Sequence, residues 1–169
     1  MANHAVVRTD AMTGTDVGSQ LVSVKYLGAN GSTPTAIENG NILKIGALVS
    51  GEREVYVGAD VAANTKLKDV VLIASPEVCY DERKHNLDDF INEAGSICRG
   101  YHFNSGDTFS VTTEALSGEG TPAVGNIVEL AAGTKLAFAA SATQASTQVG
   151  RIIAVDVAGQ YTYYVIKVD

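Results

Sequence analysis

The chain is poor in the residues from which small proteins build metal sites and cross-links. Its 169 residues include two cysteines, Cys79 and Cys98, which form neither a CxxC pair nor part of a histidine-rich zinc pattern. The sequence does not place the two sulfur atoms within bonding distance, so we expect two reduced, mostly buried thiols rather than a disulfide. Tryptophan is absent and proline occurs only three times. The chain is nevertheless long enough to bury a core without disulfides or metal.

Positive charge is also in short supply. The 12 lysines and arginines face 19 aspartates and glutamates, which gives a formal net charge of −7. Such a surface repels the phosphates of nucleic acids and of anionic lipids, so we expect neither a nucleic-acid partner nor a membrane partner. No apolar run is long enough to cross a bilayer, and the start of the sequence lacks the basic and apolar regions of an export signal.

The residue patterns of catalytic sites are missing as well. The three histidines, His4, His85 and His102, lie far apart and lack metal-ligand spacing. His85 with either cysteine could in principle form a nucleophile pair, but neither an oxyanion turn nor a third orienting group accompanies it. No glycine-rich loop carries the Lys and Ser or Thr of a phosphate site. We therefore predict that the protein is not an enzyme and has no catalytic, metal or cofactor-binding residues and no cofactor.

What the sequence does contain is a repeated turn-and-strand phrase. A glycine followed by Asn or Asp opens an alternating run three times, at Gly40–Ile45, Gly106–Val111 and Gly125–Leu130. Glycine adopts positive φ without steric cost, and Asn or Asp can hydrogen-bond its own backbone, so each phrase favours a turn that feeds a strand. Either module duplication or the ordinary turns of a β-protein would produce such repetition.

Apolar patterns favour strands along most of the chain. In the first part these runs cover residues 21–26, 42–49, 54–57, 70–74, 97–103 and 108–113. Because the 70–74 run is apolar throughout, it is typical of a strand buried on both faces. Four later strands are each marked by one apolar face: Val128 and Leu130; Leu136 and Phe138; Ile153, Val155 and Val157; Tyr164, Ile166 and Val168. The small and polar stretch 139–148 resembles an exposed hairpin tip.

One segment favours a short α-helix, at about residues 86–94. Asn86 can serve as its N-cap, apolar residues follow at helical spacing from Leu87 to Ala94, and Gly95 supplies a C-terminal stop. The expected fold class is therefore mainly β, with small β-barrel or sandwich units and one short α-helix.

Composition also predicts how the chain is divided. Residues 1–20 are small, polar and aperiodic, which favours a flexible N-terminal arm. Residues 21–116 form a β-rich unit with the short helix, and residues 123–169 form a β-barrel-like unit. The stretch 117–122 is a possible linker between them. The alternative is that both units belong to one continuous domain.

Short phrases recur in a definite order along residues 36–168. They are Ile37–Asn41, Gly51–Tyr56, Ala74–Asp81, Asn92–Gly95 and Gly106–Thr112, followed by Val124–Asn126 and the ending Tyr164–Val168. This order resembles that of small structural proteins of tailed bacteriophages, the auxiliary head proteins that are also called decoration or cement proteins.

The resemblance implies a non-enzymatic virion protein. Such a protein sits on the capsid exterior, often as a homotrimer, and stabilises contacts between copies of the major capsid protein, its partner; before assembly it would reside in the host cytoplasm. Contacts of this family often involve a terminal arm, which places the expected capsid-contact residues, Val6, Val7 and Arg8, by position alone.

Two other functions are compatible with a small β-rich chain. One is a phage tail or fibre component that binds the host surface, for which the 139–148 stretch and the face that carries Tyr161 and Tyr163 could serve. The other is a trimeric β enzyme of the dUTPase type, although the catalytic aspartate and glycine-rich phosphate motifs of that family are not found.

Overall fold

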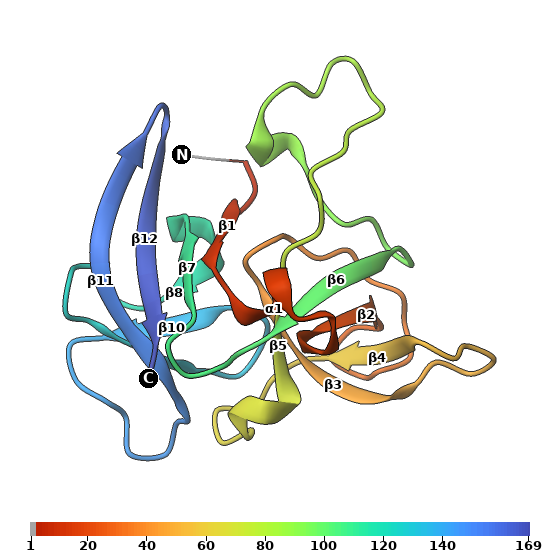
Figure 1. Cartoon of the computed structure of the whole chain (residues 1–169), viewed down its shortest axis with the longest axis horizontal. Coiled ribbons are helices and arrows are strands. Elements are labelled where there is room, and N and C mark those ends of the chain that lie inside the picture. The colour runs from red at the N-terminus through yellow and green to blue at the C-terminus, as the bar shows by residue number, and fades with distance from the viewer. Residues whose placement is uncertain (1–2) are drawn as a thin grey trace.

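Five strands close into a small barrel (Figure 1). The computed structural model describes residues 3–169. The barrel strands, in spatial order, are β2 (Leu21–Tyr26), β4 (Val55–Ala59), β3 (Ile42–Leu48), β5 (Val70–Ile73) and β6 (Ile97–His102). β2 and β4 run parallel, and the other neighbours are antiparallel. The mainly β fold with a small barrel, expected from the sequence, is thus confirmed.

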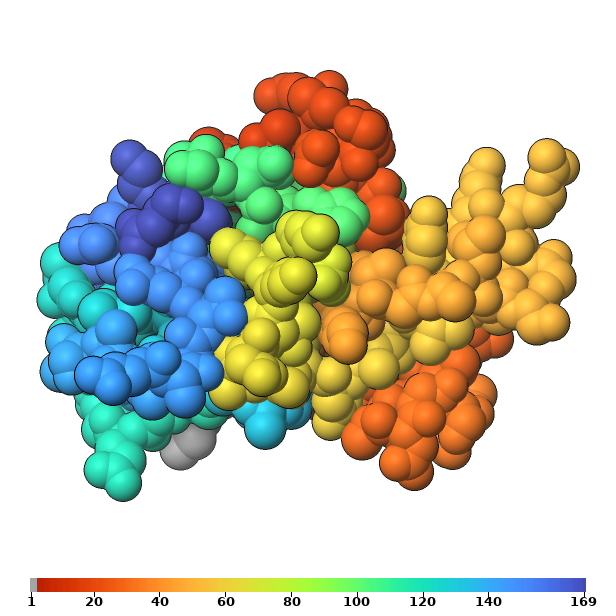
Figure 2. Space-filling view, turned by 90° about the horizontal axis from the view of Figure 1, so that it is seen from below, coloured from red at the N-terminus to blue at the C-terminus, as the bar shows by residue number. Residues whose placement is uncertain are grey.

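A seven-stranded sheet stands beside the barrel. Its strands, in spatial order, are β1 (Val7–Ala11), β7 (Thr108–Val111), β12 (Tyr161–Val168), β11 (Gln148–Ala158), β9 (Ile127–Leu130), β10 (Leu136–Ala139) and β8 (Leu116–Ser117). Only the β10–β8 pair is parallel among these described strands. In the view from below, orange residues of the barrel occupy one end of the long axis and blue residues of the sheet the other, with yellow residues between them (Figure 2).

Strand β5 joins the cores of the barrel and the sheet. Its four residues are fully buried, and their alternation sends Val71 into the barrel interior and Leu72 into a second cluster. That second cluster also contains Phe109 and Leu130 from the sheet, so barrel and sheet bury a common set of side chains. The expectation that this run is buried on both faces is confirmed, and burial of each aliphatic side chain contributes about 1.5–3 kcal/mol.

Side chains fill the barrel and leave no room at two of its glycines, Gly58 and Gly100. A Cβ added at Gly58 would lie 2.6 Å from Val24 Cγ1 and 2.8 Å from Leu43 Cδ1. At Gly100 it would lie 2.9 Å from Val71 Cγ2. A barrel of this size is therefore a packed core rather than a binding cavity.

The α-helix expected at about residues 86–94 is not formed. Only a 3-10 turn, η3 (Leu87–Asp89), occurs there, and Phe90 is already extended. The N-cap prediction at Asn86 was correct, because its side chain and that of Asp89 form a reciprocal capping box. The helix ends early because Asn92 pairs with Ile37, with backbone hydrogen bonds in both directions. The single α-helix in residues 3–169 is instead α1 (Thr13–Asp16).

The expected N-terminal arm is part of the folded body. Residues 3–20 contain β1, α1 and the 3-10 turn η1 (Gly18–Gln20), and β1 pairs antiparallel with β7. Val6 and Met12 are each only 2% exposed. The prediction of a flexible arm over residues 1–20 was therefore wrong for residues 3–20; residues 1–2 lie outside the described part of the chain.

The sheet also crosses the expected unit boundary. β7 lies within the expected first unit, residues 21–116, yet it pairs with β12 of the expected second unit. β8 begins at the last residue of the first unit and pairs with β10, which also belongs to the second. Ser117, the first residue of the possible linker, belongs to β8 and its hydroxyl donates to the backbone oxygen of Leu136. The change from barrel to sheet falls between β6 and β7 instead, where five residues separate His102 from Thr108.

Candidate interaction surface

Hydrogen bonds hold the N-terminal segment, residues 3–13, at both of its ends. The backbone N–H of Asn3 donates to Asp88 Oδ2 at 2.8 Å, and His4 Nδ1 lies 2.9 Å from Glu38 Oε1. At the other end, the backbone N–H and the hydroxyl of Thr13 both donate to Asp107 Oδ1, at 2.9 Å and 2.6 Å. Because these carboxylates come from distant parts of the chain, the segment ties the fold together.

The three residues expected to contact a capsid lie within this segment. Val6 is 2% and Val7 8% exposed, so both side chains contact the protein's own core and are not available at the surface. Arg8 is partly exposed; its guanidinium carbon lies 4.1 Å from the centre of the Tyr163 ring, and its Nη2 donates to Asp156 Oδ2 at 2.9 Å. The structure therefore directs attention to other residues as contacts.

Arg8 and Asp156 connect the segment to a long hairpin. Strands β11 and β12 pair from Gly150 and Val168 to Ala158 and Tyr161, with one register shift between Ile152 and Ala154. In contrast, β9 accompanies β11 only to Arg151, and β7 accompanies β12 only from Tyr164. Residues 153–163, the hairpin tip, therefore form a two-stranded ribbon that projects from the sheet (Figure 1).

The two faces of the hairpin tip differ. On one face, Asp156 lies opposite Tyr163, and the N-terminal segment covers this pair through Arg8. On the other, Val155 lies opposite Tyr164 and Val157 opposite Thr162, and paired residues of antiparallel strands share a face. We call the latter the apolar face. Val155 is 43% and Val157 71% exposed, so these two residues share a face, as expected, but it points to solvent. Ile153, the third residue expected on this face, lies at a register shift and has no partner on β12.

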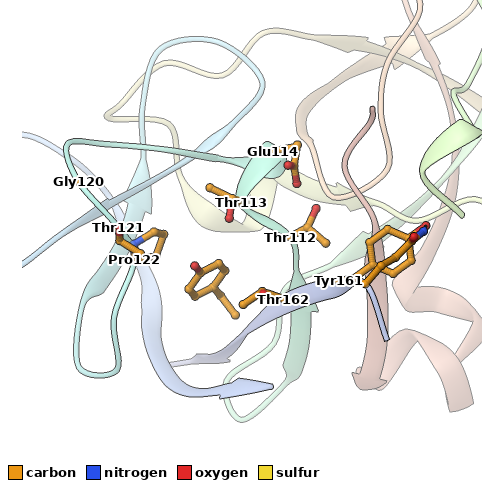
Figure 3. Close-up of a pocket in the computed structure, with 10 residues that line it drawn as sticks. Thr112, Thr113, Glu114, Gly120, Thr121, Pro122, Tyr161 and Thr162 are labelled. Atoms are coloured by element: carbon orange, nitrogen blue, oxygen red, sulfur yellow. The ribbon is translucent and has the colours of Figure 1, made fainter. Parts of the chain in front are cut away.

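A groove of about 500 Å³ adjoins the apolar face. Thr162 and Tyr164 line it on the hairpin side, and Glu114 and Pro122 contribute to the rest of its lining. Figure 3 shows Pro122 across the groove from Thr112. Threonine and tyrosine side chains make up much of its lining and offer contacts for a side chain of a partner.

A second projecting segment is the loop of residues 75–91. It carries exposed apolar side chains, with Val78 56% and Tyr80 96% exposed. Arg83 pairs with Asp81 at 2.8 Å, and because the Arg83 side chain is 89% exposed, such an ion pair adds little stability. The loop rises on the same side of the molecule as the hairpin tip (Figure 1). Hydrogen bonding joins the two, because the Tyr161 hydroxyl donates to Asp88 Oδ1 at 2.6 Å.

This junction perturbs the pKa of Asp88. The hydrogen bond from the Tyr161 hydroxyl, followed by that from the backbone N–H of Asn3, holds the pKa of Asp88 below its ordinary value. These hydrogen bonds therefore favour the ionised carboxylate, although Asp88 is only 7% exposed and burial alone would disfavour its charge. Three separate segments thus meet at one carboxylate: the N-terminal segment, the loop and the hairpin tip.

Of the two cysteines considered as nucleophiles with His85, Cys98 is not brought near it. Cys98 lies in the barrel core, and burial raises the pKa of its thiol to about 11, whereas His85 is exposed in the loop of residues 75–91. Within residues 3–169, no three His, Cys, Asp or Glu side chains are grouped so that they could hold a metal ion. No helix in this described range is long and apolar enough to cross a membrane.

Comparisons with models of protein families, with curated protein sequences and with solved structures gave no match. No relative therefore assigns a role to any residue of this chain. The surface formed by the hairpin tip and the loop of residues 75–91 could not be found by sequence reasoning, because alternation such as that of Val155 and Val157 does not reveal which face is covered.

Proposed function

We propose that this protein is a capsid decoration protein that binds the exterior of a phage capsid and stabilises contacts between copies of the major capsid protein. One observation carries the proposal. Most of the exposed large apolar side chains of residues 3–169 lie on the hairpin tip and on the loop of residues 75–91, which project together. Exposed apolar side chains gathered on projecting segments are typical of protein-binding surfaces.

Two further features support this function. The order of phrases over residues 36–168 resembles that of decoration proteins, and the mainly β fold with a shared core is a rigid scaffold for a binding surface. A decoration protein strengthens a shell by adding contact area at many copies, each contributing a modest free energy, and needs no catalytic residue. Within this proposal the protein occupies the capsid exterior as a homotrimer.

Tyr80 is the residue on which we expect docking to depend most. It is almost fully exposed and belongs to a residue type that dominates binding energy once it is buried at an interface. In the capsid complex its ring would enter a pocket of the partner. Loss of such an aromatic anchor typically costs about 2 kcal/mol or more, which corresponds to roughly 30-fold in affinity.

Co-sedimentation with capsids that lack this protein tests the proposal. We expect the purified protein to saturate the capsids at a fixed ratio, Tyr80→Ser to bind roughly 30-fold more weakly, and Val17→Ser to bind like the parent. Val17 is the matched control because it is exposed but lies outside both projecting segments. A protein that fails to sediment with capsids and instead binds host cells would belong to the tail or fibre.

A further inference from the structure

Strand β11 has an edge that no part of the described chain covers. On the side away from β12, its pairing partner β9 ends opposite Arg151, and two more backbone hydrogen bonds join Ile152 to Gly125 and Asn126. Beyond Ile152 no ladder or backbone hydrogen bond within residues 3–169 involves this side of β11. We call residues 153–158 on this side the free edge.

The free edge has little of the usual protection of exposed strand edges: a register shift between Ile152 and Ala154 marks only its start. Such edges normally carry lysine or proline, or are very short. Here six residues include three exposed β-branched apolar side chains, Ile153, Val155 and Val157, and a single charge, Asp156. An unpaired, apolar, β-branched edge is a template for another extended segment, whose main chain would complete the ladder.

The hairpin tip is held in place before any partner arrives. Arg8 stacks on Tyr163 and bonds Asp156, and the Tyr161 hydroxyl bonds Asp88. These contacts fix both strands of the tip from its covered face. Binding to an edge that is already ordered does not require the tip to lose conformational freedom, which favours affinity.

The charge around the free edge indicates the chemistry of the partner. Arg8 bridges Asp156 and Asp10, with its nitrogens 2.9 Å and 3.5 Å from their oxygens, so one positive charge stands against two negative ones. The Asp156 side chain remains 49% exposed. Two copies meeting at this edge would each bring this local excess of negative charge and repel each other, whereas a basic partner would be attracted.

We propose that the free edge of β11 is a strand-addition site for an extended segment of a partner protein that alternates apolar and basic residues. Apolar side chains of the added strand would extend the face of Val155 and Val157, and its basic side chains would lie on the face of Asp156. The inference rests on the proposed function, since it names the kind of capsid-protein segment that the hairpin tip takes.

A peptide titration without any capsid tests this site separately from capsid binding. The probe is a fluorescent ten-residue peptide of alternating valine and lysine, and the comparison peptide has glutamate in place of lysine. We expect the lysine peptide to bind with slowed amide exchange at residues 153–158, and the glutamate peptide to bind at least about tenfold more weakly.

Protein variants locate the binding. Val155→Lys and Val157→Lys should each weaken the lysine peptide by about tenfold or more, because they place a like charge on the edge. Val17→Lys should not, and it is a close control because Val17 and Val155 are equally exposed, at 43%. Val157 is 71% exposed, so its variant folds even if Val155→Lys does not.

Three results would overturn the proposal: no binding of the lysine peptide, equal binding by the edge variants and the parent, or a dimer that the edge variants dissociate. The last would show a second copy on the free edge. Failure here with intact capsid co-sedimentation would remove the strand-addition site and leave the decoration function. Peptide binding without capsid binding would keep the strand-addition site and remove the decoration function.

Discussion

Met12 provides a direct test of whether the N-terminal segment belongs to the folded core. Its side chain is 2% exposed and lies in the cluster that contains Phe109 and Leu130. Replacing a buried methionine with alanine removes the transfer free energy of the lost atoms and leaves a cavity, so we expect Met12→Ala to cost about 2–5 kcal/mol of unfolding free energy. A flexible arm would contribute almost nothing.

Urea unfolding followed by circular dichroism measures this difference. With a denaturant slope of roughly 2–3 kcal/mol/M for a chain of this size, the midpoint should fall by about 0.7–2.5 M at an unchanged slope. Val17→Ala is the control in the same region, because Val17 is 43% exposed, and its midpoint should stay close to that of the parent. A Met12→Ala midpoint equal to that of the control would refute the packing of residues 3–20.

Three further predictions concern the barrel, the carboxylate junction and the thiols. Gly58→Ala should cost about 1–3 kcal/mol because the new methyl group meets Val24 and Leu43, whereas Gly18→Ala, with nothing within 4 Å, should be nearly neutral in the same urea assay. The pKa of Asp88 is lowered in the folded state, so the stability that this carboxylate contributes is fully present above its unfolded pKa and is lost as the pH falls through its folded pKa. Asp88→Asn should therefore flatten the acid limb of a curve of unfolding free energy against pH. The control variant Asp16→Asn, at an exposed position, should leave that limb unchanged. Burial raises the pKa of Cys98 to about 11, so at pH 8 iodoacetamide should modify the half-buried Cys79 and spare Cys98 until the protein unfolds, and equal rates would contradict the barrel placement.

The strands were predictable where local pattern and burial agree. The fully apolar run at Val70–Ile73 proved to be buried on both faces, and the alternation at Tyr164, Ile166 and Val168 marks a buried face. The same alternation at Val155 and Val157 leads to solvent, because the core beneath β11 ends before the strand does. Periodicity gives the sidedness of a strand but not what covers each side.

Long-range pairing explains the other departures from the sequence expectations. The segment around β1 looks like an arm because its partner β7 lies about a hundred residues later, as in the pairing of Val7 with Val111. The helix signal after Asn86 is overridden by the bridge from Asn92 to Ile37, supported by buried hydrogen bonds from the Asn92 side chain. Local propensity is a weak determinant when distant partners compete for the same backbone.

The surface we propose for docking has no signature in a single sequence. Tyr80, Val155 and Val157 are ordinary apolar residues whose importance comes from their exposure on projecting segments. Their identification required the fold, as did the burial of Val6 and Val7, the residues that sequence position favoured. Contacts of a binding surface follow from accessibility, which is a property of the whole structure.

The copy number of this protein in purified virions, measured by quantitative mass spectrometry against the major capsid protein, tests the central claim most directly. The account predicts a near-integer ratio, such as one copy per major capsid protein, as expected for trimers that decorate the shell. A handful of copies per particle, or none, would contradict it.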